Sequence, residues 1–219
     1  MYYLSVFLIF TIQNVDNGTE TAVQYFLDRM YMTRISIRML YNQHLYIHGD
    51  NIAKPRHVGQ IDPYCDVSAS ITRAYDEASK LCQMHYGRFP ELVIKTVNKS
   101  ENEADNVPIM FAYVPSHLHH MVFEVLKNSM RATVESAKTP ESAMTPIQVM
   151  ISKTDVDITI KISDNGGGIP RNSMGNLFKY MYTTAGRVGR AHRDLVRDSD
   201  MPPMAGLGYG LPLSRLYAR

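Results

Sequence analysis

One segment of the chain carries an imidazole, a carboxylate and a carboxamide at the repeat of an α-helix. In residues 116–135 (SHLHHMVFEVLKNSMRATVE), His120, Glu124 and Asn128 follow one another at intervals of four residues. Side chains at that spacing lie on one face of a helix. The carboxylate could accept a proton, the imidazole could tune it, and the carboxamide oxygen could bind a hard cation. The alternative is that these residues simply form the solvated face of the helix.

A second candidate is a glycine-rich turn that begins with an acidic residue. Asp164 opens the sequence Asp-Asn-Gly-Gly-Gly-Ile-Pro, directly after a stretch of alternating isoleucines. A carboxylate at a strand end can accept a hydrogen bond from an exocyclic amino group such as that of adenine. Gly166 and Gly168 would let a flat ring approach the backbone. An ordinary glycine turn leaving a strand has the same sequence signature.

A third candidate is a loop of alternate glycines near the end of the chain. Residues 206–212 (GLGYGLP) precede a short helical stretch, LSRLY. Backbone N–H groups and the positive end of a helix dipole suit phosphate. The loop does not open a β-α-β unit, and the chain has neither a P-loop sequence nor the V-A-I-K and D-F-G elements of ordinary protein kinases. These three nucleotide-binding classes are therefore disfavoured.

A long polar segment separates the second and third candidates. Residues 186–205 contain four arginines and three aspartates. A loop of this length inside a compact domain is uncommon and often forms a lid over a site. A solvated loop without such a function is the alternative.

The first part of the chain is predicted to be helical. Apolar residues recur at helical spacing over residues 19–47, which predicts one long helix, a candidate member of a helix bundle. A second helix is predicted to begin after Asp66 as its N-cap and to end at Gly87.

The second part, from about residue 88, is predicted to combine strands and helices. Strands are expected at residues 92–97 and 109–113, a helix capped by Ser116 follows, and residues 147–152 and 156–163 form a hairpin. This order predicts an α+β fold, with an antiparallel or mixed sheet and helices on one face.

Composition excludes several classes of protein. The 219 residues include 23 basic and 21 acidic ones, a net charge of +2, which gives no electrostatic basis for binding nucleic acid. The only cysteines, Cys65 and Cys82, are not in a metal-binding spacing and fit a reducing compartment. The apolar run at residues 2–12 is too short to span a membrane and lacks the basic flank of a signal or transit peptide.

In this order, the candidate segments resemble the GHKL-type ATP-binding fold shared by gyrase, heat-shock chaperones, MutL and histidine kinases. Within that superfamily, FEVLKNSMRATVE, DNGGGIP, YMYTTA and GLGYGLPLSRLYAR resemble the mitochondrial pyruvate dehydrogenase kinases. YFLDRMYMTRISIRMLYNQH in the long helix resembles the same family. The related branched-chain ketoacid dehydrogenase kinases match less well around YMYTTA. The resemblance covers residues 24–219.

The resemblance implies roles for individual residues. Glu124 would accept the proton of a substrate serine, His120 would tune Glu124, and Asn128 would hold Mg²⁺ at the ATP phosphates. Arg34 and Arg38 would line an allosteric pocket for pyruvate-like acids, although arginines that extend along a bundle helix would have the same sequence. The implied ATP-binding residues are Glu124, Val125, Leu126, Lys127, Asn128, Ser129, Met130, Arg131, Asp164, Gly166, Gly168, Thr183, Thr184, Gly206, Leu207, Gly208, Tyr209, Gly210 and Leu211.

The implied activity is the ATP-dependent phosphorylation of a serine on the E1α subunit of the pyruvate dehydrogenase complex, in the mitochondrial matrix. That reaction inactivates the complex and so regulates glucose oxidation. The implied partners are E1, the lipoyl domain of the E2 component and a second copy of the kinase. Two alternatives stay open. One is a nucleotide-binding fragment without activity, and the other is an ATPase or histidine kinase of the same fold.

The family pattern also predicts how the chain is divided. Family members are close to twice this length, so a chain truncated at both ends is expected. The predicted parts are an unmatched apolar leader (residues 1–13), the remnant of a regulatory helix bundle (residues 14–87) and an ATP-binding α/β sandwich without its last strands (residues 88–219). The family tail that supports dimer and lipoyl-domain contacts has no counterpart here.

Overall fold

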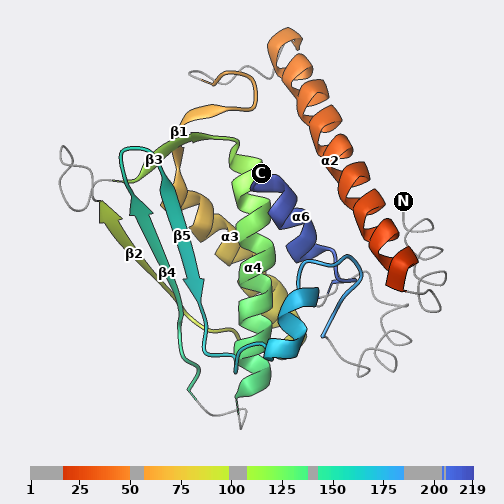
Figure 1. The fold of residues 1–219 in the computed structure, drawn as a ribbon. Coiled ribbons are helices and arrows are strands. Elements are labelled where there is room, and N and C mark those ends of the chain that lie inside the picture. Colours follow the sequence, from red (N-terminus) through yellow and green to blue (C-terminus); the bar gives the residue numbers. More distant parts are fainter. Residues whose placement is uncertain (1–16, 50–56, 99–107, 138–142, 185–203, 205) are drawn as a thin grey trace.

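A computed structural model describes residues 17–49, 57–98, 108–137, 143–184, 204 and 206–219 of the chain. Its elements, in chain order, are α2 (Asn17–His48), β1 (Asp62–Asp66), α3 (Val67–Tyr86), β2 (Leu92–Asn98), β3 (Met110–Tyr113), α4 (Pro115–Ser136), β4 (Ile147–Lys153), β5 (Ile158–Ser163), the 3₁₀-helix η1 (Arg171–Asn176) and α6 (Gly210–Tyr217). Figure 1 shows the sheet on one side, α4 in the middle and α2 on the far side of α6.

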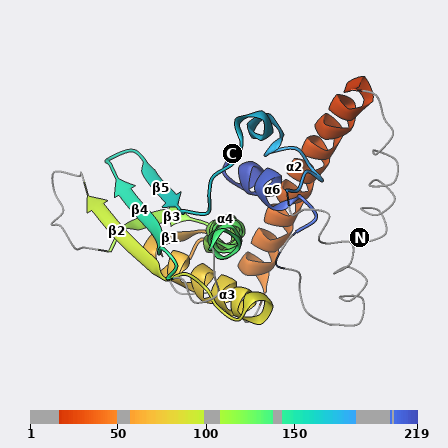
Figure 2. The ribbon, with the colours of Figure 1, turned by 90° about the horizontal axis from the view of Figure 1, so that it is seen from below.

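The main sheet has the order β2-β4-β5, with β2 parallel and β5 antiparallel to the central strand β4. On β4, Ile147, Val149 and Ile151 are buried while the residues between them are exposed or half-buried, so one face of the sheet is apolar. Helices α3 and α4 form the second layer, and their buried residues belong to the same hydrophobic core as β4 (Figure 2). The predicted α+β fold, with a mixed sheet and helices on one face, is confirmed.

Helix α3 begins and ends where the sequence predicts. The Asp66 side chain accepts a hydrogen bond from the Ala69 N–H at 3.0 Å, and Gly87 ends the helix in the left-handed conformation, at φ 69°. The buried face of α3 packs on α4, so α3 contributes to the core of the sandwich. The division predicted near residue 88 stays a prediction.

Four local features differ from the sequence expectation. Helix α4 starts at Pro115 after Val114 rather than at a Ser116 cap, because the first turn of a helix needs no N–H from proline. Strand β5 starts at Ile158, since the preceding residues close a turn in which Thr154 N–H donates to the Asp157 carbonyl at 2.9 Å. Strand β1, which contains a proline, and the 3₁₀-helix η1 were not expected.

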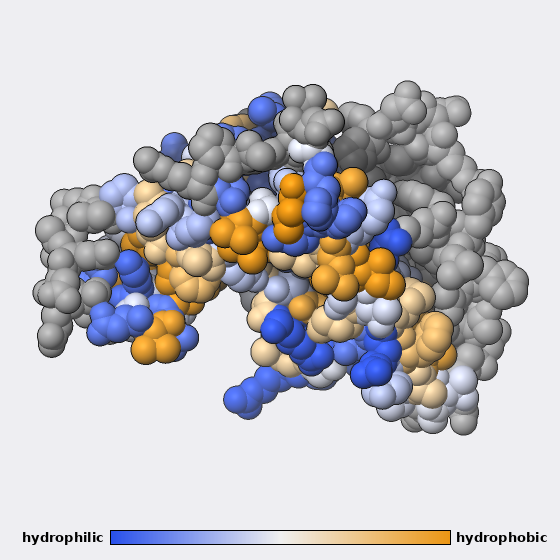
Figure 3. Space-filling view, turned by 90° about the horizontal axis from the view of Figure 1, so that it is seen from above, coloured by the Kyte–Doolittle hydropathy of each residue, from blue (hydrophilic) through white to orange (hydrophobic). Residues whose placement is uncertain are grey.

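Helix α2 confirms the predicted long helix and contacts the rest of the molecule along one side. Its Leu27 is 1% exposed and packs with Tyr180 and with Leu216 of α6. Other positions of α2 carry exposed apolar residues, among them Phe26, Ile37, Leu40, Tyr41 and Ile47. On the face of the molecule seen in Figure 3, hydrophobic residues form small groups separated by hydrophilic ones. Among the described residues, no helix is both long and apolar enough to cross a membrane.

Candidate nucleotide-binding and catalytic site

Glu124 lies half-way along α4 in an ion pair. Lys127, one turn later, donates a hydrogen bond to Glu124 Oε1 at 2.9 Å, and the two side chains are only 9% and 15% exposed, respectively. The Lys127 ammonium also lies 5.3 Å from the centre of the Phe123 ring. The family resemblance placed Lys127 in the nucleotide stretch without this pairing. An acid and a base three residues apart on a helix are themselves a signal for such a pair.

The glycine loop lies directly against this carboxylate. A Cβ atom at Gly210, the first residue of α6, would clash with Glu124 Oε2. Gly208 has φ +80° and lies against the backbone of Tyr182, where a side chain would also clash. Glycine is therefore required at Gly208, whereas a larger residue at Gly210 would displace the end of the flexible Glu124 side chain. The chain brings the predicted base and the predicted phosphate loop into contact.

His120 lies one turn before Glu124 and is half-buried. Its ring meets the Tyr217 ring edge-on, with centroids 5.1 Å apart, and its Nε2 atom has no hydrogen-bond partner among the described residues. Burial lowers the pKa of His120, the Glu124 charge opposes that shift, and the Lys127 and His119 charges add to it. His120 is therefore neutral near pH 7. Its role as a tuner of Glu124 stays a prediction.

Asp164 and its glycine turn lie beside the same helix. The Gly166 N–H donates to Asp164 Oδ1 at 3.0 Å, which closes the turn after β5. A Cβ at Gly166 would clash with Ala132 of α4, one turn beyond Asn128. Asp164 is exposed and Asn128 is half-buried. Their roles toward a ligand stay predictions.

The remaining predicted residues divide into three groups. Thr183 and Thr184 are exposed and follow Tyr182, the residue against which the glycine loop packs. Arg34 and Arg38 are exposed on α2, outside the group around Glu124. The predicted lid, residues 186–205, lies outside the described residues except for the buried Met204.

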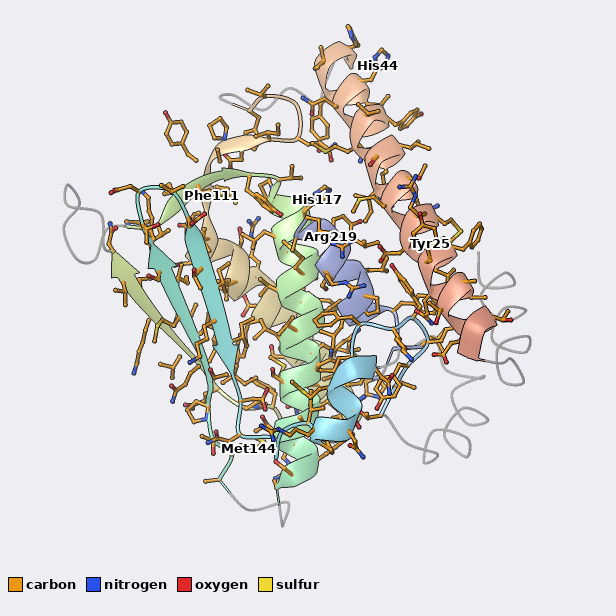
Figure 4. All side chains as sticks on the ribbon, viewed as in Figure 1. Tyr25, His44, Phe111, His117, Met144 and Arg219 are labelled. Atoms are coloured by element: carbon orange, nitrogen blue, oxygen red, sulfur yellow. The ribbon has the colours of Figure 1, made fainter. Side chains whose placement is uncertain are left out.

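At its N-terminal end, α4 meets the end of α6. Figure 4 shows His117 there, near the C-terminal end of α6 and Arg219, which follows that helix. The rings of His117 and Tyr217 lie 4.6 Å apart, and the Tyr113 hydroxyl donates to the Tyr217 carbonyl at 3.1 Å. Because both ends of α6 are held against α4 or β3, the start of α6 stays next to Glu124.

Comparison with known proteins supports the resemblance. Residues 113–219 match the family model described as histidine kinase-, DNA gyrase B- and HSP90-like ATPase, and residues 10–62 match that of the mitochondrial branched-chain α-ketoacid dehydrogenase kinase. The chain is 50% identical over 207 residues to a mitochondrial [pyruvate dehydrogenase (acetyl-transferring)] kinase of Drosophila melanogaster. It is 48% identical to isozyme 4 of that kinase from Homo sapiens over 206 residues, and 48% identical to the kinase of Ascaris suum over 208 residues. The chain belongs to the mitochondrial pyruvate dehydrogenase kinase family.

The family match covers the site but not whole family members. These alignments include 94% of the chain and 48% or 49% of each relative, so the chain spans about half the length of the curated relatives it matches. Helix α4, the Asp164 turn and the glycine loop all lie inside the ATPase match, whereas Arg34 and Arg38 lie inside the kinase-specific one. The latter begins at residue 10, within the leader (residues 1–13) that was expected not to resemble the family.

Proposed function

We propose that the chain carries the nucleotide-binding and catalytic centre of a pyruvate dehydrogenase kinase, which transfers the γ-phosphoryl group of ATP to a serine on the E1α subunit of the pyruvate dehydrogenase complex. The contact between the Glu124 carboxylate and Gly210 carries this proposal. It puts a base beside the loop that would hold the phosphates, where a hydroxyl nucleophile must lose its proton.

Glu124 is the general base of this reaction. Its carboxylate accepts the serine proton while the serine oxygen bonds to the γ-phosphorus and the bond to the bridging oxygen breaks, which releases ADP. Lys127 holds Oε1 of the base, so that Oε2 remains on the side of the glycine loop. His120 is half-buried and neutral, so it adds no positive charge beside the base.

The residues present fit ATP with its adenine at the Asp164 turn and its phosphates at the glycine loop. Asp164 accepts a hydrogen bond from the adenine amino group, and Gly206 to Leu211 hold the phosphates with backbone N–H groups. A Cβ at Gly206 would meet no atom of the described residues within 4 Å. Thr183 and Thr184 directly follow Met181 and Tyr182, whose backbone lies against Gly208, and so would lie beside the nucleotide.

A magnesium ion fits this site only together with the nucleotide. Among the described residues, no group of three or more His, Cys, Asp and Glu side chains is arranged to hold a metal. Asn128 would supply one protein oxygen, which suits Mg²⁺, since this ion usually keeps waters and phosphate oxygens as its other ligands. When bound, the ion neutralises charge on the transferred phosphoryl group.

The names of the relatives support the wider setting. They are mitochondrial kinases of pyruvate dehydrogenase, so we place the chain in the mitochondrial matrix, with E1 as substrate and the lipoyl domain of E2 as an anchor. Arg34 and Arg38 would form the pocket for pyruvate-like acids. A second copy of the chain is a further partner by analogy with the family.

Substitution of the base tests the proposal. Glu124→Gln removes the proton acceptor but leaves the adenine and phosphate contacts, so transfer of label from ATP to purified E1 should be lost while ATP binding, measured by calorimetry, persists. Wild-type transfer by this variant would contradict the role of Glu124.

The same assay separates the alternatives. Phosphate release without E1 would favour an ATPase, and label on histidine would favour a histidine kinase. ATP binding without either product would identify a nucleotide-binding fragment without activity.

A further inference from the structure

One face of α2 binds a short segment of the ATP-binding domain, residues 179–181. Glu20, Gln24 and Asp28 stand one helical turn apart on this face. Glu20 Oε1 accepts a hydrogen bond from Lys179 Nζ at 3.0 Å. Asp28 accepts one from the Tyr180 hydroxyl at 3.3 Å. The same carboxylate pairs with Arg215 of α6 at 3.5 Å and with Arg219, which follows α6, at 3.2 Å.

Gln24 makes the most specific of these contacts. Its Oε1 atom accepts a hydrogen bond from the Tyr180 N–H at 2.7 Å, and its Nε2 atom donates to the Tyr180 carbonyl at 3.2 Å. A single side chain thus satisfies both backbone groups of one residue, as a neighbouring strand would. No other side chain of the same shape and size supplies both a donor and an acceptor here.

Aromatic packing continues the contact into the glycine loop. The Tyr31 ring of α2 stacks on Tyr180 with centroids 5.3 Å apart and meets Tyr209 edge-on at 6.0 Å. Tyr209 and the buried Tyr180 are members of the same small hydrophobic core as Leu27. Helix α2 therefore contacts a residue of the phosphate loop itself.

The segment held by Gln24 has a strained backbone. Met181 has φ +66°, and it is the one non-glycine residue with positive φ in the described part of the chain. Such a conformation persists where its surroundings determine it. Here the Met181 N–H donates to the Gly208 carbonyl at 3.0 Å, on the side of the glycine loop. Gln24 holds the preceding residue from the side of α2.

From this arrangement we infer that Gln24 and Asp28 of α2 are positioning residues for the glycine loop. Their side chains hold the backbone and hydroxyl of Tyr180, and Tyr180 in turn fixes the strained turn at Met181. Through its hydrogen bond to the Gly208 carbonyl, that turn fixes the backbone of the loop that would hold the phosphates. The inference rests on the proposed function in one respect, that this loop binds a nucleotide. It adds that a helix outside the ATP-binding fold sets the affinity of the loop.

The test uses Gln24→Met, which keeps the length of the side chain and removes both hydrogen bonds. Gln43→Met is the matched control, because Gln43 bridges the Val58 carbonyl and the Gln60 N–H in the same way, at 3.0 Å each, near the other end of α2. The whole chain is used, and ATP affinity is measured by calorimetry. Gln24→Met should weaken ATP binding about tenfold, within the usual range of coupling between sites. Gln43→Met should leave it unchanged.

Hydrogen exchange distinguishes positioning from a general loss of stability. In Gln24→Met, the Met181 amide should exchange faster while amides in the middle of α4 keep the wild-type rate. Asp28→Asn removes the charge that pairs with Arg215 and Arg219, so it should also weaken ATP binding and speed exchange of the Met181 amide. This variant replaces Gln24→Met in the test if Gln24→Met does not fold. Equal ATP affinity and equal Met181 exchange in the variants and the wild type would overturn the inference. An absence of ATP binding by the wild-type chain would instead overturn the proposed function.

Discussion

Glu124 and Gly210 illustrate how the site depends on a missing side chain as much as on a polar one. Gly210→Ala would insert a methyl group into the position of Glu124 Oε2, so the carboxylate or the loop must move. Since a displacement of about 1 Å can cost on the order of a hundredfold in rate, we expect phosphoryl transfer to E1 to fall between about tenfold and a hundredfold. Gly175→Ala, whose Cβ would meet no atom of the described residues within 4 Å, is the control and should retain wild-type transfer.

His117 and His120 make the stability of the protein depend on pH. Burial lowers the pKa of both below 6.5, and for His117 the charges of His120 and Arg38 act in the same direction. The unfolded chain therefore binds protons at a higher pH than the folded one. The free energy of unfolding should fall as the pH decreases through 6.5 and stop falling below the folded-state pKa values.

Urea unfolding at several pH values between about 7.5 and 5.5, a range around the ordinary histidine pKa, measures this effect. The double variant His117→Asn, His120→Asn should show a smaller decrease than the wild type. His44→Asn, on the exposed surface of α2, should keep the wild-type decrease. An equal decrease in the double variant would assign the effect to other groups.

Among the elements, α4 serves the core and the site at once. Leu118, Val122, Leu126 and Met130 are buried against α3 and the sheet, while Glu124 and Asn128 lie on another side of the same helix. The position of α4 depends on α3 through this shared core. A substitution that destabilises α3 should therefore lower the free energy of unfolding of the whole sandwich.

The N-cap of α3 provides a test of this dependence. Asp66→Ala removes the hydrogen bond to the Ala69 N–H and should lower the free energy of unfolding of the sandwich by about 1 kcal/mol. Asp66→Asn keeps an oxygen acceptor and should cost much less. Chemical unfolding followed by circular dichroism measures both. A similar loss in the two variants would mean that the carboxylate acts through its charge and not through the cap.

At the scale of the whole molecule, α2 is joined to the ATP-binding sandwich by a small core of its own. Leu27, Tyr180 and Leu216 form this core, separate from the one beneath the sheet. Leu27→Ala should lower the free energy of unfolding by about 3 kcal/mol, in the range of buried leucine truncations. The loss should be local, with faster amide exchange in α2 and an unchanged rate in α4.

Leu40 supplies the comparison, because it lies on the same helix and is 71% exposed. Leu40→Ala should change stability by no more than about 0.5 kcal/mol, as for most surface substitutions. If Leu27→Ala accelerates exchange equally in α2 and α4, then the two cores unfold together and α2 is not a separate unit.

Local chemistry explains which predictions from sequence succeeded. Apolar periodicity and terminal residues such as Asp66 and Gly87 act within one helix, so the bounds of α2 and α3 could be predicted closely. Strand β1 escaped prediction because it pairs with β3, far along the chain, and contains a proline. The start of α4 was misplaced by one residue because Ser116 and Pro115 are both common at helix N-termini.

The sequence by itself determined the candidate site segments, the alternation on β5 and the family, since spacing and residue type carry that information. Only the tertiary structure decided that Glu124 meets Gly210, that Lys127 holds Glu124, and that Gln24 holds Tyr180. These contacts join residues on different elements or select one rotamer among several. Their geometry depends on how α2, α4 and α6 pack, which no local pattern encodes.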